Sequence, residues 1–183
     1  ANWGAHLNDI AMWGANLERT SPSEIEAAGK YPEPGQLWDV ILDFDMHFTY
    51  ANGLKLVCQT AEDAFVRFEG SEGFFSVSWK GKSESSDPAL LKWKPGANDL
   101  TLPFKRSEKR DFLDAVHSRG QTLCDAEIGH RVNALAHLGL AAIDLKRKLL
   151  WDPVKEKPAK PDAELTKRLA PAPVRDKWKS YAA

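Results

Sequence analysis

Residues 39–60, DVILDFDMHFTYANGLKLVCQT, alternate apolar and polar side chains in a way that predicts a β-hairpin. The even-numbered positions from 40 to 50 are apolar or aromatic, whereas the odd-numbered positions are mostly acidic or polar. A period of two over this length indicates a long strand with one buried face and one polar face. Asn52-Gly53 then predicts a type I′ turn, and Leu54, Leu56 and Cys58 restart the alternation in a returning strand.

More strands are expected directly after this hairpin. Residues 64–69 and 73–79 have strand-like patterns and are separated by the turn at 70–73, and residues 82–86 fit a short edge strand. Adjacent strands joined by tight turns usually pair as an antiparallel meander. We therefore predict one open sheet of about five or more strands.

The chain on either side of the strands is expected to be helical or irregular. Helices are predicted over 5–19, 105–119, 126–150 and 162–169. In the second of these, Phe112, Ala115 and Val116 are expected to face inward, and Gly120 fits the C-cap. Residues 20–35 are expected to form a loop. Strands followed by helices predict an α+β fold, in which an open, mainly antiparallel sheet has helices packed on one face.

Composition and charge exclude several classes of function. The 183 residues carry 25 basic and 26 acidic side chains, a formal net charge of −1, which gives no electrostatic footprint for nucleic acid or an anionic membrane. No apolar run approaches the ~20 residues of a membrane span. Cys58 and Cys124 lack metal-ligand spacing, and buried thiols are favoured over a disulfide.

The first residues read like the inside of a folded domain, and we expect further sequence upstream of Ala1. The compartment, cytoplasmic or periplasmic, is therefore not determined. Motifs for a self-contained active site are also absent, because the sequence has no GxGxxG, GxxxxGK[ST], GxSxG or HExxH. If the protein does chemistry, a partner domain must supply half of it.

One segment combines residues with chemical potential. On a helix, Asn2, His6, Asp9 and Trp13 follow each other at steps of four, three and four, so they share one face. An oriented histidine can act as a general acid or base near neutral pH, and a neighbouring aromatic ring can stack on a sugar or a nicotinamide. The alternative is a helix N-terminus with Asn2 as its cap and His6 as an ordinary polar residue.

Five segments in order resemble the C-terminal domain of the glucose–fructose oxidoreductase/inositol dehydrogenase (Gfo/Idh/MocA) family. The motif D-x-G-x-H-x-x-D of that family is similar to NWGAHLND at residues 2–9, except that Asn2 replaces the aspartate. The other matching segments are FVRFEGSEG at 65–73, KRDFLDAVHSR at 109–119, EIGHR at 127–131 and KLLWDP at 148–153. The resemblance thus covers about residues 1–155, with 156–183 as a tail packed on the domain.

The resemblance implies a dihydrodipicolinate-reductase-like C-terminal domain that binds substrate, forms homo-oligomers through its sheet and is inactive by itself. NAD or NADP would be bound mainly by an N-terminal Rossmann domain that is absent from this chain, and that domain would supply a catalytic lysine. His6 would transfer the proton, with Asn2 orienting it, and Asp9, Trp3 and Trp13 would contact a sugar, a sugar derivative or a cyclitol. Asn2 cannot stabilise an imidazolium by charge as aspartate does.

Two other functions stay open on the sequence. Transient oxidation at one sugar carbon would allow elimination, which would make the protein a hidden-redox glycoside lyase or isomerase. The chain could also be a non-catalytic module that binds carbohydrate or assembles oligomers.

Several further residues have modest expected roles. No metal site is expected at His130 and His137, and Arg131 is expected to pair with a carboxylate. The acidic face of 39–50 is expected to be solvated or to face another subunit, with Ile41, Val57, Phe65 and Phe75 as possible apolar contributors. Core or interface positions are expected for Trp38, Trp79, Trp93 and Trp178.

Overall fold

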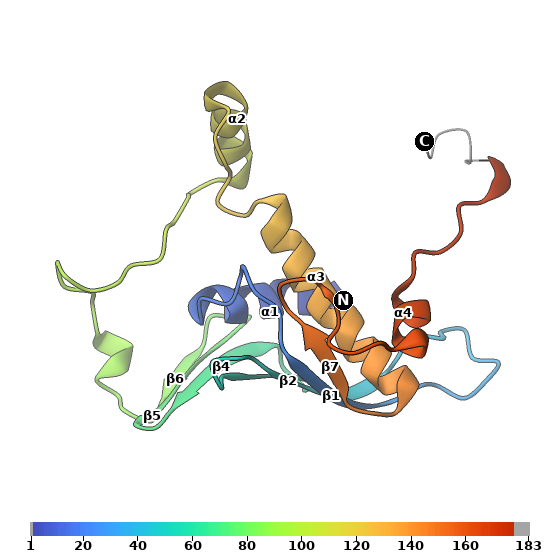
Figure 1. Ribbon diagram of the computed structural model, residues 1–183. Helices are drawn as coiled ribbons and strands as arrows, with labels where there is room; N and C mark the ends of the chain where they lie inside the picture. The colour runs from blue at the N-terminus through green and yellow to red at the C-terminus, as the bar shows by residue number, and fades with distance from the viewer. Residues whose placement is uncertain (1, 178–183) are drawn as a thin grey trace.

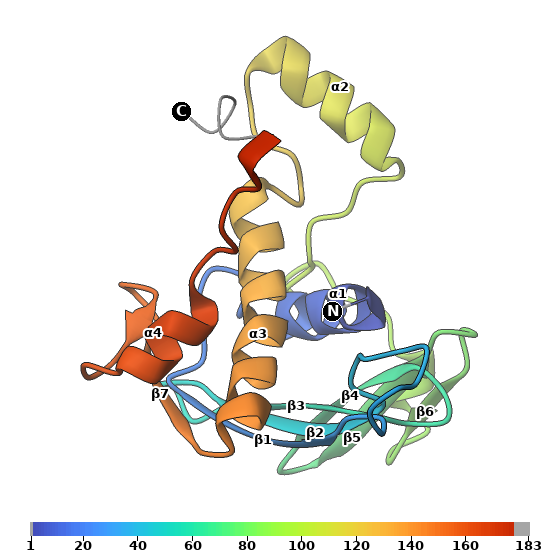
Figure 2. The same ribbon diagram turned by 90° about the vertical axis from the view of Figure 1, so that its right-hand side faces the viewer.

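A computed structural model describes residues 2–177 and shows helices layered over antiparallel β-sheet (Figure 1, Figure 2). The helices are α1 (Asn2–Gly14), η1 (Leu90–Lys92), α2 (Glu108–Ser118), α3 (Ala126–Leu145) and α4 (Ala163–Leu169). The strands are β1 (Glu24–Lys30), β2 (Asp43–Thr49), β3 (Lys55–Gln59), β4 (Phe65–Gly70), β5 (Gly73–Ser78), β6 (Ser83–Ser85), β7 (Leu149–Asp152) and β8 (Lys157–Pro158). The predicted α+β architecture with antiparallel strands is confirmed.

The hairpin of β2 and β3 confirms the alternation that predicted it. Met46 and Phe48 are buried, whereas Asp45 and His47 between them are exposed. The turn type was wrong, because Gly53 has a φ of 85° but Asn52 is outside the positive-φ region that a type I′ turn requires. Instead, the amide of Gly53 donates to the carbonyl of Tyr50 at 2.9 Å, closing a three-residue loop.

The segment predicted as a loop over 20–35 contains β1, a central strand of the larger sheet. The order of that sheet is β3-β2-β1-β7-β8, so β1 is paired on both edges. Its sequence, EIEAAGK, has one large apolar residue, Ile25, and little of the β-branched or aromatic content that marks strands. The strand is held by its neighbours, since Ile25 pairs with both Phe48 and Leu149.

The remaining strands form a second sheet, β4-β5-β6, rather than continuing the first. In this smaller sheet Phe68 pairs with Phe75, and Val66 pairs with Val77. Phe75 therefore shares a face with Phe68, whose ring packs against Gly14 of α1, so Phe75 turns toward the helices and not outward as expected. The small sheet is consequently fixed to α1.

α3 crosses the larger sheet and supplies much of the core. The buried side chains along this helix include Leu135, Leu138 and Ala142. The helix ends earlier than predicted, because Lys146 adopts the left-handed conformation (φ 51°) and the chain turns into β7. Leu149 and Trp151 are buried in that strand. Their apolar side chains explain why the end of the helix was predicted too far along the chain.

α2 is shorter than predicted, and its apolar face is not buried. Phe112 and Val116 are exposed, because the helix stands away from the body of the molecule (Figure 1). Arg119, with a φ of 56°, occupies the left-handed position that ends the helix, one residue before Gly120. The expected inward packing of this helix was therefore wrong within the described residues.

The last described elements return to the core. α4 confirms the predicted short helix, with Asp162 accepting a hydrogen bond from the amide of Leu165 at 3.0 Å, and Leu165 is fully buried. Cys58 is half-buried and Cys124 is exposed, so burial of both thiols was not correct, and both are free. None of the helices in the described part of the chain has the length and apolar content needed to cross a membrane.

Candidate functional site

α1 turns one side toward the core and another outward. Asn8 and Met12 are buried, with only 6% and 1% exposed, whereas the His6 side chain is exposed and Asp9 and Trp13 are half-buried. Burial raises the pKa of the Asp9 carboxyl, and His6 lies close enough to oppose this rise. The helix therefore holds an accessible imidazole beside a carboxyl group.

Asn2 and Trp3 were predicted to belong to the same site. Asn2 and Trp3 belong to the first turn of α1, but their side chains lie outside the described part of the structure. Orientation of His6 by Asn2 and substrate contact by Trp3 stay predictions.

The structure adds an aromatic side chain that the sequence did not assign to the site. The rings of His6 and Trp79 have centroids 5.6 Å apart and are tilted by 50°. Trp79 follows β5 directly, and 52% of it is exposed. No local pattern could have indicated this pairing, because it depends on how the small sheet packs against α1.

A group of carboxyl side chains that influence one another includes Asp9, the neighbour of His6. Burial raises the pKa of Asp9 above its usual range, and the neighbouring His6 opposes this rise. Burial also raises the pKa of Glu18, and the negative charge of Asp9 adds to it. A hydrogen bond from Arg19 lowers the pKa of Asp125, and the Nη2 of Arg19 lies 2.8 Å from Oδ2 of that residue. Asp9 is the carboxyl of this group that interacts with His6, and a carboxylate is suited to binding a hydroxyl group.

Of the two histidines considered for metal binding, His130 has a carboxylate partner and His137 is exposed. His130 Nε2 lies 2.9 Å from a carboxylate oxygen of Glu156. Arg131 pairs with Glu127 at 2.7 Å and with Glu156 at 3.0 Å, as expected for this arginine. Among residues 2–177, no cluster of three or more histidine, cysteine or acidic side chains could hold a metal ion.

The acidic face of β2 is exposed in this structure. The sequence predicted that this face is either solvated or covered by another subunit. Asp45 and His47 form a pair on this face with an Oδ1 to Nε2 distance of 3.0 Å. Val57 of β3 is also exposed and pairs with His47 across the strands. The side of the larger sheet opposite the helices is open in both ribbon views (Figure 1, Figure 2).

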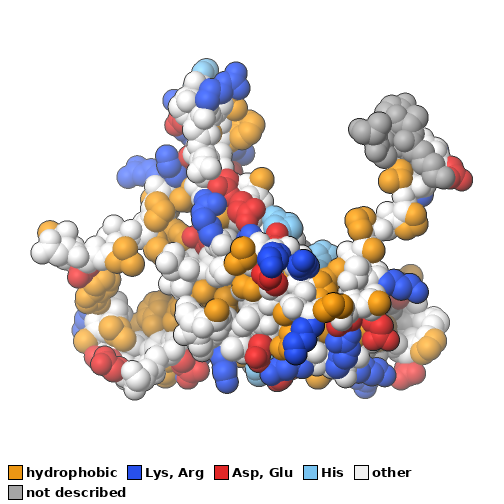
Figure 3. All heavy atoms as spheres, in the orientation of Figure 1, with side chains coloured by type: hydrophobic (Ala, Val, Ile, Leu, Met, Phe, Trp, Pro, Cys, Tyr) orange, Lys and Arg blue, Asp and Glu red, His pale blue; other side chains and the backbone are white. Residues whose placement is uncertain are grey.

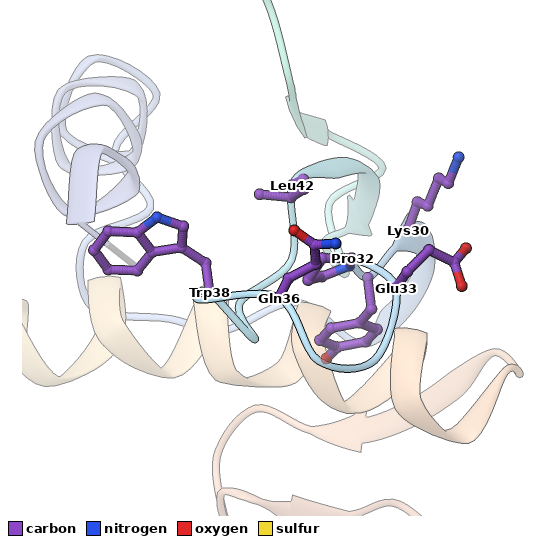
Figure 4. Close-up of a pocket in the computed structure, with 7 residues that line it drawn as sticks. Lys30, Pro32, Glu33, Gln36, Trp38 and Leu42 are labelled. Carbon is purple, nitrogen blue, oxygen red and sulfur yellow. The ribbon is translucent and has the colours of Figure 1, made fainter.

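Two hollows lie elsewhere on the surface, and His6 lines neither of them. One has a volume of about 390 Å³ and lies in the loop between β1 and β2, where Tyr31, Gln36 and Trp38 help to line it (Figure 4). The Tyr31 hydroxyl donates to Asp144 at 2.7 Å and so ties this loop to α3. The other, about 420 Å³, lies between α2 and the beginning of α3.

Comparison with solved structures shows that other proteins share this fold. The aldose-aldose oxidoreductase from Caulobacter crescentus superposes with a TM-score of 0.56 at 11% identity, and 80% of this chain covers 45% of that protein. An NAD-binding protein from Listeria innocua gives 0.57 at 20% identity, with 81% of this chain covering 46% of that one. A Thermotoga maritima protein gives 0.59 at 17% identity, with coverages of 80% and 45%.

The chain spans less than half the length of each of these three proteins. A comparison with curated protein sequences gave no match. Residues 1–180 match the family described as "Oxidoreductase family, C-terminal alpha/beta domain". This match covers nearly the whole chain, and the protein therefore belongs to the Gfo/Idh/MocA oxidoreductase family, of which it is the C-terminal α/β domain.

Proposed function

We propose that this chain is the substrate-binding half of an NAD(P)-dependent oxidoreductase that acts on a sugar, a sugar derivative or a cyclitol. The observation that carries the proposal is the exposed imidazole of His6, with Asp9 on its helix and the Trp79 ring 5.6 Å away. Sugars and cyclitols offer hydroxyl groups to a carboxylate and a C–H face to an aromatic ring. Asp9 can bind a hydroxyl group and Trp79 can contact a C–H face, and both lie beside His6, which can transfer a proton.

The reaction divides between this chain and the cofactor. In the oxidation of a CH–OH group, the carbon loses a hydride and the oxygen loses a proton, leaving a carbonyl. A bound nicotinamide would accept the hydride. His6 would take the hydroxyl proton, since a neutral imidazole is a good proton acceptor near neutral pH. Asp9 would hold a neighbouring hydroxyl and Trp13 would border the substrate, so that the reacting carbon faces His6.

The residues present fit a chain that meets the nicotinamide end of NAD(P) but does not hold its phosphates. No GxGxxG turn occurs in the 183 residues, so the usual cradle for a pyrophosphate is absent from this sequence. His6 lies on an open surface that another domain can cover. We therefore propose that an N-terminal Rossmann domain of the same protein binds the cofactor, and that this chain alone is inactive.

Replacement of His6 in the full-length enzyme tests the proposal. His6→Ala should lower kcat by about 10²-fold or more, because general acid–base catalysis typically contributes this much. His137→Ala is a matched control, because His137 is exposed on α3 and takes no part in the proposed site. A loss of less than tenfold for His6→Ala, or equal losses for the two variants, would contradict the role of His6 in proton transfer.

Product analysis tests the reaction type. A dehydrogenase forms one NAD(P)H for each substrate oxidised. Turnover of a glycoside without accumulation of NAD(P)H would instead identify the hidden-redox lyase, in which the hydride returns to the product. Binding of sugar without any turnover in the full-length protein would leave only a carbohydrate-binding role.

We also propose that the open side of the larger sheet forms homo-oligomers. Val57 is exposed there next to His47, and Leu150 is exposed on the same face on the far side of β1, so the face offers apolar contacts among polar side chains. Val57→Asp should reduce the oligomer measured by light scattering, whereas Val154→Asp, at an exposed position in the turn after β7, should not. A monomeric full-length protein would refute this assignment.

A further inference from the structure

α2 is carried on an arm, residues 87–122, that projects from the body of the domain. In both ribbon views α2 stands on the helix side, away from the larger sheet (Figure 1, Figure 2). Within the arm before α2, the side chains of Leu100 and Phe104 are largely exposed, Leu100 to 91%. The space-filling view shows α2 projecting from the body of the domain, with hydrophobic and basic side chains on its surface (Figure 3).

The helix at the end of the arm has an apolar face that is largely exposed among residues 2–177. Phe112 and Val116 are 60% and 44% exposed, and with Ala115 they line the groove of about 420 Å³ between α2 and α3. Amphipathic helices are stabilised mainly by burying such a face. An exposed apolar patch of this kind usually marks an interaction site.

Hydrogen bonds at the base of α2 join the helix to the segments before and after it. The Asp111 carboxylate is buried, and its Oδ2 accepts from the amide of Leu123 at 2.7 Å. Lys105 lies 3.3 Å from the other oxygen of Asp111, and Ser107 caps the helix by accepting from the amide of Arg110 at 3.3 Å. These contacts anchor both ends of α2 to its connecting segments, and the apolar face lines one groove with the beginning of α3.

The groove adjoins the surface that the proposed function leaves to another domain. Asp125 lines the groove, and the charges of Asp125 and Asp9 both raise the pKa of Glu18 and of Cys124, so the two carboxylates lie around the same pair of residues. Asp9 in turn lies beside His6. A domain that covers His6 and Asp9 therefore comes within reach of α2.

We infer that α2 and its groove are the docking surface for the nucleotide-binding domain of the same protein. The inference rests on the proposed function for the nature of this partner. It is supported by the solved relatives, of which this chain covers only 45–46%, so that each has more than half its length to place against such a surface. Intramolecular interfaces between domains commonly combine an apolar centre with a polar rim, as Phe112 and Val116 do with Arg119 and Thr122 here.

Site-specific photo-cross-linking in the full-length protein tests the inference. A benzophenone amino acid at Phe112 should cross-link to peptides that precede Ala1, whereas the same group at Arg110 should not. Arg110 is a suitable control because it pairs with Asp114 at 2.9 Å on a different side of α2 and is highly exposed. Cross-links from position 112 to residues of a second copy, to residues 1–183 of the same chain, or to no peptide would each overturn the inference.

A second measurement does not depend on the cross-linker. The double variant Phe112→Ser/Val116→Ser should speed amide exchange along α2, because it removes the apolar contacts that the other domain would cover. Arg110→Ser should not. Unchanged exchange in the double variant would also overturn the inference. Both readouts are independent of sugar turnover, so a failed docking result can be told from a failed assignment of the reaction.

Discussion

Alanine substitution at two glycines of α3 gives a sharp test of how this helix packs on the sheet. Gly139 faces β2, where an added Cβ would overlap the Sδ atom of Met46 and lie 3.2 Å from Cζ of Phe48. Gly129, in the first part of the same helix, has no such neighbour within 4 Å. The two variants therefore share the change in helix propensity and differ in packing.

The two effects have opposite signs at Gly139. Alanine is favoured over glycine in a helix interior by about 1 kcal/mol. Overpacking a tight core costs about 1–3 kcal/mol. The unbranched Met46 side chain can move aside, but the ring of Phe48 is almost fully buried and has little room. We expect Gly139→Ala to destabilise the domain by about 1 kcal/mol and Gly129→Ala to stabilise it by up to about 1 kcal/mol.

Hydrogen exchange of the α3 amides in the full-length protein measures this difference in the domain concerned. A loss of about 1 kcal/mol should speed exchange of the slowest amides about fivefold. Gly129→Ala should slow it or leave it unchanged. If Gly139→Ala stabilises the helix as much as Gly129→Ala does, then α3 does not approach β2 as closely as described here.

Substitutions at three further positions test the candidate site and two carboxyl groups. Trp79→Ala should raise KM for the sugar by about three- to tenfold with a smaller effect on kcat, whereas Trp79→Phe should keep most of the binding; an unchanged KM would remove Trp79 from the site. Burial raises the pKa of Asp9, so the charged form of Asp9 is disfavoured in the folded state. At pH values above the folded-state pKa, Asp9→Asn should therefore have a higher Tm than the wild type, and this gain should vanish as the pH falls below 3.8. The amide of Leu165 lowers the pKa of Asp162, so the wild-type advantage over Asp162→Asn should be present above pH 3.8 and disappear as the pH falls through the depressed value; a difference in Tm that does not vary with pH would contradict this assignment.

The features that sequence predicted well are those encoded in a short stretch of chain. The period of two in β2 and β3 follows from side chains that alternate between core and solvent, so it could be recognised without any partner. The face shared by His6 and Asp9 needs only the period of a helix. The short helix α4 begins at a recognisable cap, Asp162.

The features that sequence missed depend on partners far away in the chain. β1 has the composition of a loop, but it becomes a strand because β2 and β7 pair with its two edges. β7 begins only four residues after the end of α3, and the change of direction is made by the left-handed Lys146. The pattern of α2 correctly gave an apolar face, but burial of Phe112 within this chain did not follow from it.

The division into two sheets explains how the candidate site acquires its aromatic residue. An added Cβ at Gly14 would lie 2.5 Å from Cζ of Phe68, so glycine at the end of α1 allows β4 to approach the helix closely. The amide of Trp79 donates to the carbonyl of Ala64 at 2.8 Å, which ties the end of β5 to the start of β4. The position of Trp79 beside His6 thus depends on the contact between Gly14 and Phe68. A single continuous sheet would have no need of this contact, whereas a separate small sheet uses it to bring an aromatic ring to the imidazole on α1.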